Sequence, residues 1–156
     1  MPRARRFRWL RALLLSLLFV AIAVLAAGWY LLAGSRAKLD GEVAVRGLGD
    51  TVSISRDSLG TATIDGKSRD DVTYALGYVH AQERFFPMDL MRRVASGRLS
   101  ELAGPATLSH DRMMRTLGLR RRAVEEYPAL PSETRALLDA YARGVNAWIE
   151  ARGRFS

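Results

Sequence analysis

The chain has 156 residues, with 24 Lys and Arg, 16 Asp and Glu and no Cys, which gives a formal net charge of +8. This length predicts one domain, and the absence of Cys excludes a disulfide framework, a thiolate zinc site and a cysteine nucleophile. Seven basic and no acidic residues lie in 1–38, whereas residues 39–156 have a net charge of only +1. A nucleic-acid-binding domain needs a basic face on its folded part, so we expect no nucleic acid partner.

The first predicted element is an uncharged segment of 22 residues at 12–33. As a helix it would span roughly 33 Å, which matches the ~30 Å hydrocarbon core of a bilayer. Five arginines precede it, so the positive-inside rule predicts a basic cytoplasmic tail at 1–11 and an inner-membrane anchor. The rest of the chain would then be periplasmic or extracellular, after a linker at 34–41. The alternative is a signal peptide cleaved near Ala33-Gly34-Ser35.

Three short strands are predicted next. Residues 42–46, 51–56 and 61–65 alternate apolar and polar side chains, which is typical of half-buried strands. The glycines at 47 and 49 predict a hairpin loop between the first two strands, and residues 57–60 predict a second turn. Such a small sheet needs a helix to cover its apolar face.

A long helix is predicted after Gly66. Ser68 is a candidate N-cap, and the two acidic residues at 70 and 71 suit the positive end of the helix dipole. The predicted inner face consists of Val72, Leu76, Val79, Phe86, Leu90 and Val94. Glu83 falls within this stripe, so we expect its carboxylate at the boundary of the core or inside it. Pro87 predicts a kink or break near Phe86, and Gly97 predicts the end of the helix.

Two further helices complete the prediction. A run from about 109 to 126 has Met113, Leu117 and Val124 on one side and an arginine triplet on a solvated face. A helix that begins at Ser132 includes Gly144, whose cost of ~1 kcal/mol relative to Ala suggests close packing against a neighbour. The fold class is therefore predicted as α+β, with three short strands followed by three to four helices.

The residues that could carry chemistry do not form a recognisable site. His80 with Glu83 and His110 with Asp111 lack the third ligand and the spacing of a zinc site, so packed or capping histidines are predicted. The serines show no G-x-S-x-G motif, and the glycines at 47 and 49 lack the third glycine of a dinucleotide loop. We therefore predict no catalytic, cofactor-binding or metal-binding residue in this sequence.

Charged and aromatic clusters have two interpretations each. Asp89 with Arg92 and Arg93, and Arg98 with Glu101, have the spacing of helix-surface ion pairs. They could stabilise a surface, or they could be buried as scaffold pairs of a larger protein. The aromatic and methionine cluster is expected to be core, although it could line an apolar pocket; its members are Tyr78, Phe85, Phe86, Met88 and Met91.

From Val52 onward the sequence resembles the opening of the penicillin acylase family, a branch of the N-terminal-nucleophile hydrolases. The resemblance covers roughly a hundred residues, in which the order and the spacing both match. It is carried by Ile54-Ser55-Arg56-Asp57 with Gly60, Ala75 to Arg84 (ALGYVHAQER), Phe86, Met88-Asp89-Leu90, Arg92-Arg93, Gly97-Arg98-Leu99, Glu101-Leu102, Gly104, Asp111, Arg115 to Gly118 (RTLG) and Tyr141-Ala142 with Gly144 to Trp148 (GVNAW). Two departures are Thr61 to Thr63, where the family usually has Val-Pro-His, and Pro87, where a Gln is common.

The resemblance implies an exported precursor that cleaves itself into two chains and uses the first residue of the second chain, a Ser, to attack an amide carbonyl. It implies a four-layer αββα fold, of which this region is an incomplete piece, the beginning of the first chain at 42–156. In the family the nucleophile, the oxyanion donors, the calcium ligands and the acyl-pocket residues lie beyond the position of Ser156. Arg92, Arg93 and Glu101 map onto structural helices.

The sequence therefore predicts a membrane-anchored fragment of a penicillin-acylase-like amidohydrolase. The family's substrates include penicillins, cephalosporin side chains and acyl-homoserine lactones. Without the nucleophile, this chain is expected to be inactive alone and to need a missing or separate second chain as its partner, with its membrane contact through 12–33. The alternative is a membrane-tethered, non-enzymatic helical interaction module.

Overall fold

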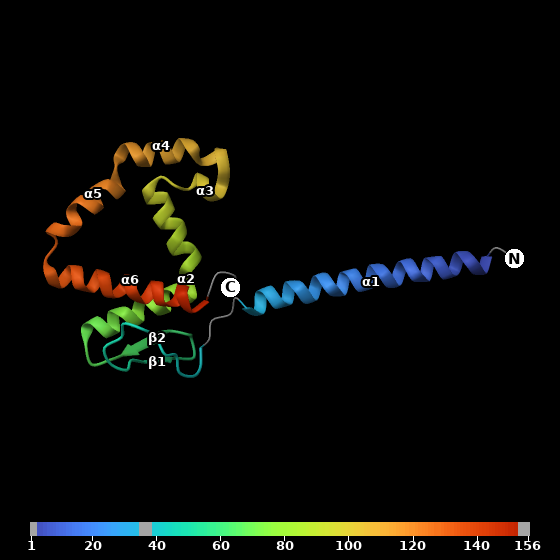
Figure 1. Ribbon diagram of the computed structural model, residues 1–156, viewed down its shortest axis with the longest axis horizontal. Helices are drawn as coiled ribbons and strands as arrows, with labels where there is room; N and C mark the ends of the chain where they lie inside the picture. Colours follow the sequence, from blue (N-terminus) through green and yellow to red (C-terminus); the bar gives the residue numbers. More distant parts are fainter. Residues whose placement is uncertain (1–2, 35–38, 153–156) are drawn as a thin grey trace. The chain divides into compact units, whose positions relative to one another are not determined.

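The computed structural model describes residues 3–34 and 39–152, which fall into two units. In the N-terminal unit, α1 (Arg3–Gly34) is one helix of 32 residues (Figure 1). Its segment Leu13–Tyr30 has a mean hydropathy of 2.3 and no buried residue, so by length and composition it could cross a membrane. The predicted linker at 34–41 falls partly on residues 35–38, which lie outside the described residues.

The second unit, described from residue 42 to 152, is rich in helix and has a sheet of two strands. Strands β1 (Ser53–Arg56) and β2 (Ala62–Asp65) pair antiparallel, with Ile54 opposite Ile64. The helices are α2 (Arg69–Ser96), α3 (Ser100–Ala103), α4 (Leu108–Leu117), α5 (Leu119–Glu126) and α6 (Ser132–Arg152), with 3-10 turns at Gly104–Thr107 and Tyr127–Ala129.

The prediction of a third strand at 42–46 is wrong, and so is the hairpin loop at 47–50. The hairpin turn lies at residues 57–61, where the Asp57 carboxylate accepts hydrogen bonds from the amides of Leu59 and Thr61 at 2.9 and 2.8 Å. The segment at 46–49, which contains the two glycines of the predicted loop, instead binds the start of α2. Tyr74 donates its hydroxyl to the carbonyl of Arg46 at 2.8 Å, and Asp71 accepts from the amide of Gly49 at 2.7 Å. These contacts hold the segment beside α2.

Helix α2 begins and ends as predicted. The Ser68 hydroxyl accepts a hydrogen bond from the amide of Asp71 at 3.0 Å, and Gly97 ends the helix with a left-handed φ of +64°. The predicted kink is confirmed at Arg84, whose φ and ψ are −136° and 24°. Its cause is Pro87, which has no amide hydrogen for the carbonyl of Glu83.

The main core lies where the first half of α2 crosses α6. Its buried side chains are Tyr74, Ala75, Val79, Ala81, Ala140 and Trp148. A Cβ atom on Gly144 would overlap the carbonyl oxygen of Tyr74, and one on Gly77 would overlap that of Tyr141. The close packing predicted for Gly144 is thus confirmed. The predicted stripe is wrong for Leu76 and Phe86, which are exposed, because the two backbones approach through small residues on another face of α2.

The single helix predicted at 109–126 is two helices. Gly118 adopts a φ of +68° and ends α4, and α5 begins at the next residue. Five α-helices therefore follow the sheet in the described part of the chain, against the three to four predicted.

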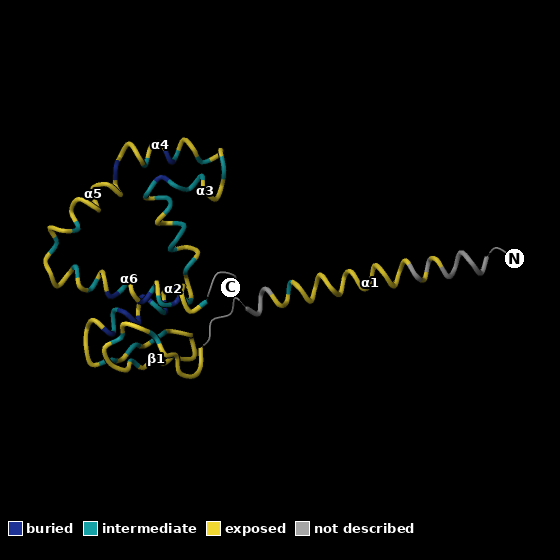
Figure 2. The backbone as a smooth tube through the Cα atoms, in the orientation of Figure 1, coloured by how far each residue is buried: buried dark blue, intermediate teal, exposed yellow. Residues whose placement is uncertain are grey.

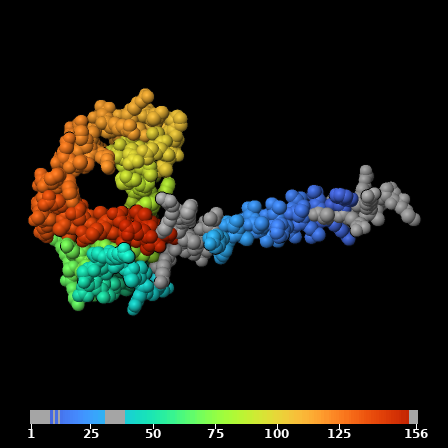
Figure 3. Space-filling model, viewed as in Figure 1, coloured from blue at the N-terminus to red at the C-terminus, as the bar shows by residue number. Residues whose placement is uncertain are grey.

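Within the second unit, the helices form an open frame. From the end of α2 the chain runs through α3, α4 and α5 and returns along α6 (Figure 1). Buried residues gather where α2 crosses α6, whereas α5 is exposed along most of its length (Figure 2). The space-filling view shows an opening between these helices (Figure 3). The frame therefore presents an inner as well as an outer surface.

Candidate functional site

The buried carboxylate of Asp111 organises the corner where α2, α3 and α4 meet. Only 2% of this residue is exposed. Its oxygens accept from the amides of Leu99 and Ser100, each at 2.9 Å, and from the Ser100 hydroxyl at 2.6 Å. Burial acts to raise the pKa of Asp111, but the hydrogen bonds from Ser100 and Leu99 outweigh it, so this pKa lies below its usual value. The ionised carboxylate is thus the form that fits the corner.

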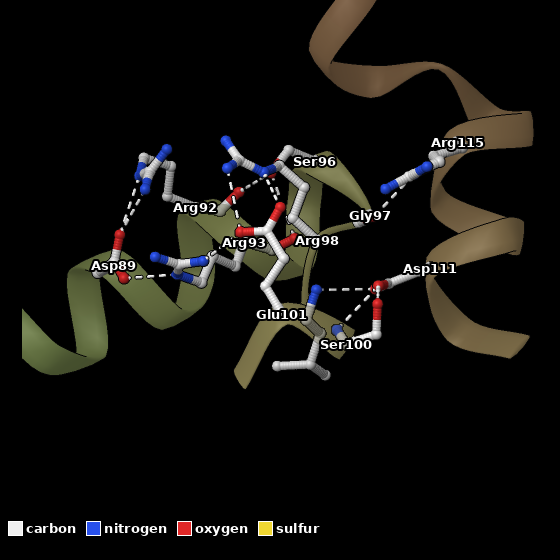
Figure 4. A network of polar contacts seen from close by, with 11 residues as sticks. Asp89, Arg92, Arg93, Ser96, Gly97, Arg98, Ser100, Glu101, Asp111 and Arg115 are labelled. Carbon is white, nitrogen blue, oxygen red and sulfur yellow. Dashed lines mark hydrogen bonds and ion pairs between the residues drawn. The ribbon is translucent and has the colours of Figure 1, made fainter. Parts of the chain in front are cut away.

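A chain of charged side chains continues from this corner along α2 (Figure 4). Asp89 contacts Arg92 and Arg93, each at 2.6 Å, and Arg93 reaches Glu101 at 2.5 Å. Glu101 also contacts Arg98 at 2.7 Å. The hydrogen bonds from Arg93 and Arg92 lower the pKa of Asp89, and those from Arg98 lead the lowering of the pKa of Glu101.

The predicted ion pairs at Asp89 and at Glu101 are confirmed, and the structure joins them into one network. Arg93 links them, because it contacts both carboxylates. The side chains of Asp89 and Arg93 are about one-fifth exposed, so this part of the network lies between the surface and the interior. Its contacts fix the end of α2 against α3, which is the geometry of a scaffold.

A second ion pair joins the sheet to α2 beside the kink. Arg56 on β1 contacts Glu83 at 2.6 Å, and Glu83 has 35% of its side chain exposed. Glu83 is thus exposed and does not lie inside the core or at its boundary as predicted, and its partner is a residue of the sheet.

The aromatic and methionine cluster is divided by the kink. Phe85 packs on Trp148 of α6, with ring centroids 5.3 Å apart. Phe86 and Met91 are instead 69% and 65% exposed, so the prediction that they belong to the core is wrong for these two. Further exposed apolar side chains of the second unit include Leu102, Met113, Leu117, Val124 and Leu138. Exposed apolar side chains are therefore found on α2, α3, α4, α5 and α6.

The two histidines lie apart. His80 is exposed and contacts the hydroxyl of Tyr141 at 3.0 Å. His110 has a buried Nε2 without a hydrogen-bond partner among the described residues. In the described ranges 3–34 and 39–152, no serine hydroxyl contacts either histidine. The same ranges contain no group of three His, Cys, Asp or Glu side chains that could hold a metal ion.

A shallow pocket of about 390 Å³ lies between the end of α2 and the α4–α5 turn. Met114 and Val124 contribute apolar surface, and Arg115, Arg120 and Arg121 contribute guanidinium groups. Arg120 and Arg121 belong to the arginine triplet at 120–122 that was predicted on a solvated face, and Arg121 forms an i,i+4 ion pair with Glu125 at 3.9 Å. Sequence reasoning missed the pocket because it depends on the bend at Gly118, which brings α5 toward α2.

Comparison with known proteins gives consistent results. A family described as penicillin amidase matches residues 51–155. Acyl-homoserine lactone acylase QuiP from Pseudomonas syringae pv. syringae is 40% identical over 111 residues, covering 71% of this chain and 14% of the relative. Penicillin acylase 2 proenzyme from Pseudomonas sp. (strain SE83) is 38% identical over 111 residues, which again cover 71% of this chain and 14% of the relative.

A solved structure, thermostable penicillin G acylase from Alcaligenes faecalis, superposes with a TM-score of 0.59 at 30% sequence identity. The match covers 65% of this chain and 54% of that one. The chain thus has the local fold of a penicillin acylase, but it spans only about 14% of the length of the curated relatives named above.

Proposed function

Because this chain belongs to the penicillin amidase family, we propose that it forms the opening part of the first chain of an acylase-like amidohydrolase. The reaction would be hydrolysis of the linear amide bond of an acylated substrate, such as a penicillin or an acyl-homoserine lactone. The observation that carries this proposal is the match at 51–155 together with relatives that are named for these two acylase activities.

The part proposed for this chain is that of a scaffold. The residues shared with the family resemblance, among them Asp89, Arg93, Glu101 and Asp111, bind one another and backbone amides. A serine nucleophile and its oxyanion donors would come from polypeptide outside this chain. The helical frame would be one layer packed against the larger four-layer body, with its exposed apolar side chains covered there.

The activity prediction is tested with the full 156-residue chain in detergent. The substrates are penicillin G and an octanoyl-homoserine lactone, and the released primary amine is measured with a fluorogenic reagent. We expect no amine from the chain alone. We expect amine when the chain is coexpressed with the part of the Pseudomonas syringae acylase that follows its matching segment.

Each outcome has a clear meaning. Turnover by the isolated chain would contradict its proposed inactivity. If the chain does not copurify with that remainder, it is not the opening segment of such an enzyme, and the alternative of an independent membrane-tethered interaction module is favoured.

We further propose that α1 is an uncleaved inner-membrane anchor with a cytoplasmic N-terminus. Its support is the apolar segment Leu13–Tyr30 and the five arginines that precede it.

In bacterial cells the chain should resist carbonate extraction, and residues from 42 onward should be cleaved by protease added to spheroplasts. The double variant Val20→Arg, Val24→Arg should be extracted, because each central arginine costs ~2.5–3.5 kcal/mol on insertion. The control Ser16→Ala should stay in the membrane, and recovery of the intact wild-type chain in the cytosol would contradict the proposal.

A further inference from the structure

The pocket beside the α4–α5 turn gathers arginines that are poorly compensated within the described residues. The arginines of the Asp89–Glu101 network all have carboxylate partners at 2.5–2.7 Å. At the pocket, Arg120 forms no ion pair within the described part of the chain. Arg121 has only Glu125, at 3.9 Å, and its side chain is 74% exposed.

Arg115, Arg120 and Arg121 all line this pocket. The Nη2 atom of Arg121 lies 3.3 Å from the position that a Cβ on Gly118 would take, so its guanidinium folds back over the turn. Arg115 donates Nε to the carbonyl of Gly97 at 2.8 Å. The positive charge of Arg115 is partly balanced by the nearby Asp111. For Arg120 and Arg121, the pocket lining contains a single carboxylate, that of Glu125. A carboxylate in the pocket would therefore complete the charge balance.

The pocket also has an apolar wall. Val124 on α5 is 61% exposed, and Met114 of α4 also belongs to the lining. A small inorganic anion would leave this wall in water, whereas a peptide segment with an acidic and an apolar side chain would satisfy both halves of the pocket.

We propose that this pocket docks an acidic residue and a neighbouring apolar residue from the part of the acylase polypeptide outside this chain. The inference rests on the proposed function. The occupant follows from the charge of the pocket and from the relatives, of whose length this chain spans about 14%, so that the partner polypeptide is much the larger body. The pocket then serves as an attachment point between scaffold and catalytic body.

The test measures assembly, using the full chain in detergent and the Pseudomonas syringae acylase remainder named above. The double variant Arg120→Glu, Arg121→Glu should weaken copurification or titrated binding about ten- to hundredfold, as expected for reversal of paired interface charges. The control is Arg112→Glu, Arg122→Glu, which makes the same charge change at exposed positions of α4 and α5 outside the pocket lining. It should bind within about twofold of wild type.

A crosslinking arm identifies the occupant. Val124 is replaced by the photoreactive residue benzoylphenylalanine, and the crosslinked peptide is identified by mass spectrometry. A crosslink to a segment of the remainder that contains Asp or Glu supports the inference. Crosslinks to lipid, to a second copy of the chain or to a segment without acidic residues overturn it.

The two proposals fail differently. If wild type assembles and both double variants bind equally well, the pocket is not a docking site, although the proposed function stands. If wild type does not assemble, the proposed function fails and the inference fails with it. Far-UV circular dichroism of each double variant confirms that a loss of binding is not a loss of fold.

Discussion

Replacement of Gly144 by alanine is expected to destabilise the second unit by about 3 kcal/mol, the upper end of the usual cost of overpacking. In an exposed helix the same change would stabilise by ~1 kcal/mol, because alanine is the better helix former. Here the added Cβ would overlap the carbonyl oxygen of Tyr74 and lie 2.9 Å from the amide nitrogen of Tyr78. Both are backbone atoms, so no side-chain rotation relieves the contact and α6 must move away from α2.

The measurement is urea unfolding of the full chain in detergent, followed by far-UV circular dichroism. Gly77→Ala should give a similar loss, because its Cβ would overlap the carbonyl of Tyr141 at the same crossing. The double variant should lose less than the sum, since one separation of the helices relieves both overlaps. The control is Asn146→Ala, an exposed change on α6 that should be neutral or slightly stabilising. A Gly144→Ala variant as stable as wild type would show that the helices do not approach this closely.

Features of the fold that depend on local chemistry were predictable from sequence. The Ser68 cap, the kink before Pro87 and the end of α2 at Gly97 each follow from a side chain and its nearest neighbours along the helix. The close approach at Gly144 was also predictable, because a glycine within a strongly periodic helix is costly unless it serves packing. The partner of this glycine was not predictable, since the crossing joins residues about 70 positions apart in sequence.

The errors share a different cause. Residues 42–46 alternate like a strand, but tertiary hydrogen bonds hold the following turn on α2, one donated by Tyr74 and one accepted by Asp71. Alternation describes which side chains a segment could bury and does not identify its pairing partner. Phe86 and Met91 have the spacing of core residues, yet they are exposed in this chain. An interaction face carries the same apolar pattern as a core, so sequence alone does not distinguish the two.

The charged network shows the same division between local and distant contacts. The pairs of Asp89 and of Glu101 with Arg98 have i,i+3 or i,i+4 spacing and were predicted. The link from Arg93 to Glu101 and the contacts of Asp111 with Leu99 and Ser100 cross a chain reversal. In the sequence, Asp111 was noted only as the neighbour of His110 and as part of the family resemblance, and neither predicted these contacts.

Replacement of Asp111 by asparagine or alanine is expected to release the corner between α2, α3 and α4. The carboxylate accepts three hydrogen bonds, and an asparagine oxygen cannot replace both carboxylate oxygens. Hydrogen exchange at the amides of Leu99 and Ser100 should accelerate about tenfold or more in the alanine variant, the factor expected for loss of a hydrogen bond. The crossing of α2 with α6 lies elsewhere, so its amides should stay protected.

The pH dependence gives a second, independent readout of the same site. Because the pKa of Asp111 in the folded chain lies below its usual value, its contribution to stability is present above the pKa of the unfolded carboxyl, near 4. The contribution is lost as pH falls through the folded pKa. Wild type should therefore lose protection at Leu99 and Ser100 in acid, whereas Asp111→Asn should already have lost it at neutral pH and change little.

Asp71→Asn, which alters another carboxylate with a lowered pKa, should leave these two amides unaffected. Equal acid sensitivity of wild type and Asp111→Asn at these amides would show that this carboxylate does not hold the corner, and that the scaffold depends on the exposed arginine pairs instead.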